Sequence, residues 1–328
     1  MTLLLASDVR IGFNTPRGRL HAVDGVNLEV EASETVALVG ESGCGKSTLA
    51  KGIVGLEPLA GGSLVFQGKP LDHQRERVRL ARQLQMVFQD PDASLNPRLT
   101  LNQALKEPLR IHGIVPRSEE EAAVCDLLSR VGIDPILRNR YPHELSGGQK
   151  QRVCIARALA VKPKLLILDE AVSALDVSVR AQILNLLSDL RKDLGLAYLF
   201  ITHDLGVVRQ FADRVYVMYL GQMVEVAHVD ALFSQPEHPY TQALLASVPR
   251  LEVGSFQRDR VLLGDVPSPL NPPAGCRFHT RCPKVFGTCK QTPPPIVSLE
   301  QRTVRCWLHA EQSPKAAGDS SASVEGAD

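Results

Sequence analysis

A glycine-rich segment, Gly40-Glu-Ser-Gly-Cys-Gly-Lys-Ser-Thr48, limits the possible folds of this chain more than any other feature. It follows the apolar run 34–40, which is typical of a buried strand, and a helix is expected to begin near Lys46. The segment fits the pattern G-x-x-x-x-G-K-[ST] in that context. Its glycines let successive N–H groups point at an anion, and the helix adds the positive end of its dipole. We therefore predict a phosphate-binding loop in an α/β protein.

The side chains of this loop have different expected roles. Lys46 should reach the β- and γ-phosphates of a nucleotide, Ser47 should bind Mg²⁺ through its hydroxyl, and Thr48 should support the α-phosphate side. Cys44 occupies a variable position and is interpreted as a spacer. The loop residues predicted to contact the nucleotide are Gly40, Glu41, Ser42, Gly43, Cys44, Gly45, Lys46, Ser47 and Thr48.

Two acidic residues, Asp169 and Glu170, follow a second apolar run at 165–168. Ligands of open α/β sheets bind at the carboxyl ends of the strands, so both acids are expected at the edge that carries the phosphate loop. Asp169 suits the shell of Mg²⁺ or of an ordered water, and Glu170 suits a general base that positions the attacking water. The alternative, a pair of surface acids that cap the next helix, is disfavoured beside a complete phosphate loop.

Strand and helix patterns alternate along the chain, which indicates an α/β core with a parallel sheet. The first two strand patterns, joined by a polar turn, predict an N-terminal antiparallel β subdomain. Helical periodicity over about 100–160 predicts an inserted helical subdomain, and after Leu245 the pattern fades into a proline-rich segment. Strands are predicted at 3–11, 20–30, 34–40, 63–67, 84–88, 164–168, 196–201 and 214–218, and helices also at 178–194 and 205–213.

Composition excludes some classes of protein. Lys+Arg number 37 and Asp+Glu 36, and this net charge of +1 argues against a nucleic-acid binder that depends on bulk positive charge. An apolar fraction of 44% excludes wholesale disorder. No apolar stretch approaches the roughly 20 residues of a membrane-spanning helix, and the N-terminus has no basic leader with a cleavage site. A cytosolic location is therefore predicted.

Four further motifs narrow the choice among nucleotide-binding proteins. Leu145-Ser-Gly-Gly-Gln149 begins a helical pattern and offers a second anion-binding helix N-terminus. Gln89 lies in Val87-Phe-Gln-Asp-Pro91, and His203 lies in Ile201-Thr-His-Asp204. The last motif is Ser173-Ala-Leu-Asp176. With these motifs in order, the sequence resembles the ABC-transporter ATPase family over roughly residues 3–245.

The resemblance implies a role for each motif. Gln89, of the Q-loop, should contact Mg²⁺ and water, and His203 should sense the γ-phosphate, although a lone histidine after a strand can be structural. Phe13 should stack on adenine, the alternative being an ordinary core aromatic. The signature loop should face an ATP held by another subunit in a head-to-tail pair, and Ser146 also suits a helix cap. The implied sets are Glu170, His203 and Lys46 for catalysis, Ser47, Gln89 and Asp169 for Mg²⁺, Leu145, Ser146, Gly147, Gly148 and Gln149 for the signature loop, and Ser173, Ala174, Leu175 and Asp176 for the D-loop.

Four segments, two of which overlap the motifs above, resemble one group within the family. Asp90-Pro-Asp-Ala-Ser-Leu-Asn-Pro-Arg98, Ala171-Val-Ser-Ala-Leu-Asp-Val-Ser-Val-Arg-Ala-Gln182, His238-Pro-Tyr-Thr-Gln-Ala-Leu-Leu245 and Pro267-Ser-Pro-Leu-Asn-Pro-Pro-Ala-Gly-Cys276 are similar to ATPases of dipeptide and oligopeptide importers. The resemblance implies ATP-driven peptide uptake at the cytoplasmic face of a bacterial inner membrane. A second ATPase subunit, two permease subunits and, indirectly, a solute-binding protein are the implied partners. Import of nickel, glutathione or another small solute, or a soluble ATPase acting on DNA or ribosomes, are the alternatives.

The expected organisation divides the chain into three parts. Residues 1–245 form an ABC-type P-loop ATPase domain, and 246–310 form a Cys- and Pro-rich extension of the peptide-importer type. Residues 311–328 are small and polar, which predicts a disordered tail.

Four of the seven cysteines fall close together in that extension, at Cys276, Cys282, Cys289 and Cys306. Their spacing contains no C-x₂-C knuckle, so from spacing alone a metal site competes with a disulfide or free thiols. The family resemblance implies a structural [4Fe–4S] cluster. Zinc is the less favoured alternative, with His279 and His309 as possible substitutes among its ligands. Cys125 and Cys154 lie in helical patterns and are interpreted as core residues.

Overall fold

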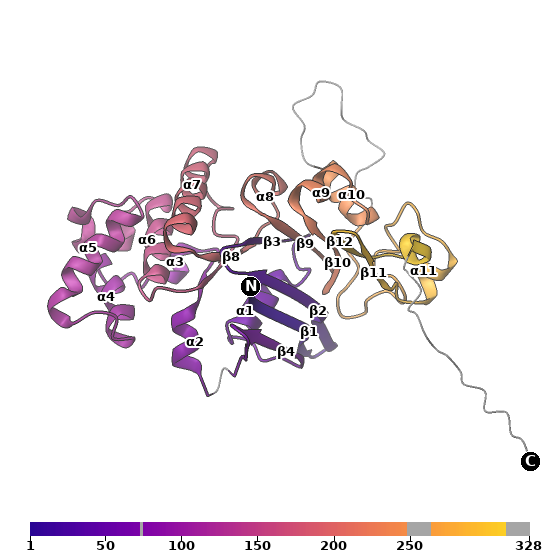
Figure 1. Ribbon diagram of the computed structural model, residues 1–328, viewed down its shortest axis with the longest axis horizontal. Coiled ribbons are helices and arrows are strands. Elements are labelled where there is room, and N and C mark those ends of the chain that lie inside the picture. The colour runs from indigo at the N-terminus through magenta and orange to yellow at the C-terminus, as the bar shows by residue number, and fades with distance from the viewer. Residues whose placement is uncertain (73–74, 248–263, 313–328) are drawn as a thin grey trace, which may run out of the picture.

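Two β-sheets of different kinds organise the chain in the computed structural model, which describes residues 1–72, 75–247 and 264–312. One is an eight-stranded sheet in the order β11-β12-β10-β9-β3-β8-β7-β6, and the other is a four-stranded antiparallel sheet in the order β2-β1-β4-β5. Figure 1 shows them side by side in the middle of the molecule, with most of the helices around them.

The centre of the large sheet consists of short, fully buried parallel strands. Every residue of β3 (Thr35–Val39), β7 (Leu165–Asp169) and β8 (Ala197–Ile201) is buried, as expected for strands covered on both faces. Successive side chains point to opposite faces, so Leu166 and Leu168 join one hydrophobic cluster, whereas Leu165 and Ile167 join another. The parallel set also contains β6 (Leu84–Val87) and β9 (Arg214–Tyr219).

The small sheet packs against one face of the large one. Buried residues alternate with exposed ones along β1 (Thr2–Thr15), the pattern of a sheet with one face in the core. Its apolar face shares a cluster with β3 and with helix α1 (Lys46–Ile53). The remaining strands of this sheet are β2 (Gly18–Glu31), β4 (Gly61–Phe66) and β5 (Lys69–Pro70).

Helices gather at one end of the molecule, seen at the left of Figure 1. They pack on the other face of the large sheet and form a single hydrophobic cluster with it. Two of them, α4 and α6, begin with a capping box, in which the first residue and a glutamine three positions later satisfy each other's backbone N–H. These helices and short turns are α3 (Pro91–Ser94), α4 (Leu101–Ile111), η1 (Arg117–Glu119), α5 (Glu120–Arg130), η2 (Pro135–Asn139), η3 (Pro142–Glu144), α6 (Gly147–Leu159) and α7 (Val177–Leu194). Helix α2 (Arg77–Gln83) instead joins the cluster of the small sheet through Leu80.

The C-terminal segment, which we define as residues 264–312, is built onto the large sheet. Its strand β12 (Arg302–Arg305) pairs with β10 (Gln222–His228), and β11 (Ile296–Leu299) pairs with β12. A third cluster joins this segment to the ATPase strands through the buried rings of Tyr219, Tyr240 and Phe278. The helices of this end are α8 (Leu205–Phe211), α9 (Val229–Ser234), α10 (Pro239–Ala246), α11 (Gly287–Gln291) and η5 (Trp307–Gln312).

The predicted α/β core, N-terminal antiparallel sheet and helical region are all confirmed, and each predicted strand overlaps an observed one. Strands β5, β10, β11 and β12 were not predicted. Strand β5 has only two residues, β10 follows β9 after a two-residue turn, and β11 and β12 lie in a proline-rich context. The domain boundaries remain predictions, and nearly all of the tail at 311–328 lies outside the described residues.

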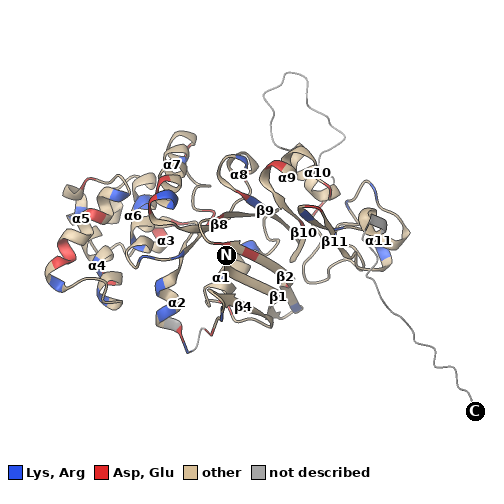
Figure 2. Cartoon of the chain, in the orientation of Figure 1, with Lys and Arg blue, Asp and Glu red and all other residues tan. Residues whose placement is uncertain are grey.

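Among the described residues, no helix combines the length and apolar character needed to cross a bilayer. Both signs of charge are spread over all layers in Figure 2.

Candidate active site

The phosphate loop connects β3 to α1 at the carboxyl end of the parallel strands. Helix α1 begins at Lys46, whose side chain is buried and whose ammonium group lies inside the loop. Lys46 Nζ donates to the carbonyl oxygens of Gly40 at 2.8 Å and of Glu41 at 3.0 Å. The cation is therefore held by the loop backbone at the position where phosphate oxygens would be bound.

Two loop glycines are required by close backbone contacts. Gly40 and Gly45 have φ values of +155° and +108°. A Cβ at Gly40 would lie 2.2 Å from the carbonyl oxygen of Met218, and one at Gly45 would lie 2.2 Å from that of Ala22. The loop can pack this closely against β2 and β9 only because both positions lack a side chain.

A cleft of about 310 Å³ opens over the loop. It brings the predicted Phe13, Gln89 and Glu170 together with the loop, although they are far apart in sequence. Phe13 therefore lies where a base could stack. The complete lining is Phe13, Leu20, His21, Ala22, Ser42, Gly43, Cys44, Gly45, Lys46, Ser47, Thr48, Gln89, Glu170, Leu220, Gly221 and Pro269.

Ser47 and Asp169 form a pair of oxygen donors beside the cleft. Ser47 Oγ donates to Asp169 Oδ1 at 2.8 Å. Burial raises the pKa of Asp169, and the Ser47 hydrogen bond opposes that rise. A hydroxyl next to a partly desolvated carboxylate matches the hard oxygen ligands that Mg²⁺ prefers, so the residues present fit this ion. Bound there, Mg²⁺ would neutralise phosphate charge.

Glu170 lies between two other predicted site residues, Gln89 and His203. Gln89 Nε2 donates to Glu170 Oε2 at 3.2 Å, and His203 Nδ1 is 3.4 Å from Glu170 Oε1. The backbone of Glu170 has a φ of +48°, an unusual conformation for a non-glycine residue. Its N–H donates to Ile201 and its carbonyl accepts from Ser173, so the surrounding chain holds that conformation.

The signature loop lies outside this cleft. Ser146 caps α6: its hydroxyl accepts from the Gln149 N–H at 3.3 Å, and its own N–H donates to Gln149 Oε1 at 2.9 Å. Ser146 and Gly147 are exposed, and a Cβ at Gly147 would meet no atom within 4 Å. The D-loop follows the same plan, since Asp176 caps α7 by accepting from Val179 N at 2.9 Å.

Comparison with known proteins identifies the family. Residues 23–173 match the family described as ABC transporter, and residues 224–289 match the one described as oligopeptide/dipeptide transporter, C-terminal region. The chain is 50% identical over 304 residues to the oligopeptide transport ATP-binding protein AppF of Bacillus subtilis, covering 91% of this chain and 92% of that protein. The chain belongs to the ABC transporter ATP-binding family. The dipeptide transport ATP-binding protein DppF of Escherichia coli is 47% identical over 302 residues, which cover 91% of this ABC ATPase and 90% of DppF.

A solved structure extends the comparison to three dimensions. It is described as a dimeric post-hydrolysis state of the ATP-binding cassette MJ0796 bound to ADP and Pi. It covers 69% of this chain and 99% of its own, with a TM-score of 0.63 and 28% sequence identity. The chain is therefore an ABC-type ATPase, and its cofactors are ATP and Mg²⁺.

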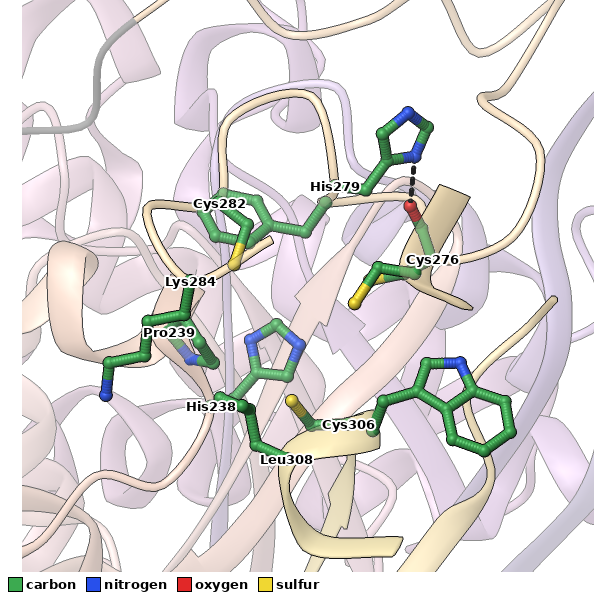
Figure 3. A pocket seen from close by; sticks show the side chains of 11 residues that line it. His238, Pro239, Cys276, His279, Cys282, Lys284, Cys306 and Leu308 are labelled. Atoms are coloured by element: carbon green, nitrogen blue, oxygen red, sulfur yellow. Dashed lines mark hydrogen bonds between the residues drawn. The ribbon is translucent and has the colours of Figure 1, made fainter. Parts of the chain in front are cut away.

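The predicted [4Fe–4S] cluster is contradicted. Cys276, Cys282, Cys289 and Cys306 do line one cavity, and in Figure 3 the sulfur atoms of Cys276, Cys282 and Cys306 point toward a common space. That space measures about 10 Å³, room for roughly one water molecule. Across the described residues, no three His, Cys, Asp or Glu side chains come together in a way that could hold a metal ion.

Burial affects the thiols that line this cavity. It raises the pKa of Cys276 and Cys282, and raises that of Cys306 to about 11. His279 Nδ1 lies 2.9 Å from the Cys276 carbonyl oxygen, and His309 Nε2 lies near Glu237. The zinc alternative fails by the same geometric test. All seven cysteines are free, which leaves free thiols among the interpretations considered.

Sequence reasoning missed several residues around the nucleotide cleft. Leu20, His21 and Ala22 reach it because β2 runs beside the loop, and Pro269 reaches it from the C-terminal segment. Tyr240 and Arg281 contact the loop directly. The segments that contain them resemble peptide-importer ATPases, but nothing in that resemblance places them against the phosphate loop.

Proposed function

We propose that this chain is the ATP-binding subunit of a bacterial importer of dipeptides or oligopeptides. The observation that carries the proposal is the extent of the match to peptide-transport ATP-binding proteins. It runs over nine-tenths of both chains and includes the C-terminal region that gives one matched family its description. A soluble ATPase that acts on DNA or ribosomes has no comparable support.

The proposed catalytic roles follow from the contacts at the cleft. Lys46 neutralises the β- and γ-phosphates from within the loop. Glu170 accepts a proton from the attacking water, and the Gln89 amide holds one of its oxygens, while the other faces His203. His203 is largely exposed at the cleft margin, which suits a residue that contacts the γ-phosphate only when the site closes.

The proposed assembly is a head-to-tail pair, in which the signature loop of one subunit covers the ATP of the other. Leu145–Gln149 lies away from the chain's own cleft and presents an exposed helix N-terminus, so its anion-binding groups are free to face a nucleotide outside that cleft. ATP would then join the two subunits, and its hydrolysis would release them. The dimeric cassette described as bound to ADP and Pi supports such an arrangement.

The remaining partners are two permease subunits, which this chain contacts from the cytoplasmic side as a peripheral membrane protein, and indirectly a solute-binding protein. The second ATPase subunit is proposed to be a different chain. The closing and opening of the ATPase pair would drive the transport cycle.

Reconstitution tests the function. The chain, its genomic-neighbour permeases and the second ATPase are placed in proteoliposomes, and uptake of a radiolabelled dipeptide is measured with ATP inside and the peptide-loaded binding protein outside. Uptake should require ATP, and it should disappear when the Glu170→Gln variant is used in place of the unaltered chain. The affinity of the solute-binding protein for the peptide should be the same in both experiments. Uptake of nickel or glutathione in place of peptides, or co-purification with DNA or ribosomes instead of membranes, would contradict the assignment.

A further inference from the structure

The C-terminal segment contacts the phosphate loop through an ion pair. Arg281 Nη1 donates to Glu41 Oε2 at 2.7 Å, and Arg281 Nη2 donates to Glu41 Oε1 at 3.0 Å. Each nitrogen therefore binds a different oxygen, and this bidentate arrangement is the strongest geometry available to these two side chains. The Arg281 side chain is only 5% exposed and that of Glu41 23%, so water screens the pair weakly.

Glu41 is also fixed through its backbone. Its N–H donates to the hydroxyl of Tyr240 at 2.9 Å, and its carbonyl accepts from Lys46 Nζ at 3.0 Å. Three groups thus hold one loop residue, and two of them, Tyr240 and Arg281, lie beyond the parallel ATPase strands in sequence. A displacement of Glu41 would move the carbonyl that orients Lys46.

The support behind these two residues is rigid. The Tyr240 ring lies 4.7 Å from that of Tyr219 and 5.4 Å from that of Phe278. The Arg281 guanidinium lies 6.0 Å above the Tyr219 ring. Because Tyr219, Tyr240 and Phe278 are buried in one cluster, the atoms that hold Glu41 have little freedom to move.

Charge gives this contact a consequence for nucleotide binding. Glu41 places a carboxylate in a loop whose ligand, ATP, is strongly anionic, and an uncompensated carboxylate there would repel the phosphates. Arg281 supplies the compensating charge from outside the loop. We propose that Arg281 is a positioning residue of the ATP site, which neutralises Glu41 and fixes the phosphate loop, so that the C-terminal segment is required for nucleotide affinity.

A second contact places the same segment at the cleft. Pro269 lines the nucleotide cleft, and it shares a neighbouring pocket with Leu20. The segment therefore meets the site at two points, through a side chain at the cleft wall and through an ion pair at the phosphate loop.

The proposal rests on nucleotide binding by the loop, and saturable ATP binding by the unaltered full chain establishes that role whatever the transported solute. Arg281→Ala should lower the affinity for ATP about tenfold, because one unpaired carboxylate then faces the phosphates. The affinity for ADP should fall less, and the affinity for adenosine should be unchanged. Adding Glu41→Gln to Arg281→Ala should restore ATP affinity to within about threefold, since the repulsive charge is gone.

Arg302→Ala is the matched control, because Arg302 also anchors the C-terminal segment, with its Nη1 3.7 Å from Glu237, but does not touch the loop. It should bind ATP like the unaltered chain. The proposal is overturned if Arg281→Ala binds ATP normally, if the double variant stays as weak as the single one, or if Arg302→Ala shows the same loss. Should Arg281→Ala fail to fold, the double variant alone decides, since normal affinity there supports charge neutralisation and a tenfold loss contradicts it.

Discussion

Replacing Gly147 by alanine separates the folding of the signature loop from its function. Gly147 is the first residue of α6 and is exposed, and an added Cβ meets nothing within 4 Å. Within the single chain, alanine should therefore be neutral or stabilise the helix by a few tenths of a kcal/mol. In the proposed dimer, the methyl group would stand between the helix N-terminus and the partner's ATP. Overpacking of that kind costs about 1–3 kcal/mol, which corresponds to roughly a 5- to 150-fold loss of ATP-dependent dimerisation.

The assay measures both quantities. Thermal unfolding reports the stability of the single chain, and light scattering with ATP, in a Glu170→Gln background that retains the nucleotide, reports dimerisation. Gly148→Ala is the contrasting control, because its Cβ would lie 2.5 Å from Val179 Cγ1 and should lower the Tm by several degrees. If Gly147→Ala dimerises and hydrolyses ATP like its parent, the signature loop does not face a nucleotide.

Three further predictions follow from the site and its surroundings. Glu170→Gln should bind ATP but lower turnover about 10²–10⁴-fold, and turnover within threefold of the parent would remove Glu170 as the base. Ser47→Ala removes a hydroxyl beside Asp169, so the Mg²⁺ concentration for half-maximal ATPase activity should rise roughly tenfold, and an unchanged Mg²⁺ titration would refute the assignment. Burial depresses the pKa of His238 to about 3, whereas an unfolded histidine titrates near 6.5. The unfolded chain thus binds more protons between these values, and stability should fall as the pH drops below about 6.5. His238→Asn, which keeps an acceptor for the Tyr240 N–H, should flatten that dependence in urea unfolding, and an unaltered slope would contradict the reasoning.

Local sequence patterns predicted the parts of the fold that local physics determines. The run 34–40 is apolar on both faces and became β3, and the glycines of the phosphate loop marked its tight backbone before any contact was known. The order of the motifs likewise predicted that Gln89 and Glu170 belong to one nucleotide site, and both line the cleft.

Long-range contacts were not predictable in this way. Nothing near Glu41 in sequence indicates that its charge is compensated by a side chain 240 positions later. The family resemblance implied an iron–sulfur cluster at the four cysteines, but neither the resemblance nor the cysteine spacing says how closely this chain packs there, and the observed cavity is too small. Pattern reasoning therefore failed where a site depends on the distance between segments rather than on the residues within one.

The pairing of β12 with β10 has a consequence for biosynthesis. The sheet that carries the ATP site ends at β10 until residues 302–305 arrive, and an unpaired edge strand is a template for association with other chains. During synthesis, β10 of the nascent chain stays unpaired until the C-terminal segment leaves the ribosome. Over the same period the phosphate loop lacks its contact with Arg281. We therefore expect a chain that ends before β12 to associate with other chains through β10 and to bind ATP more weakly than the full chain.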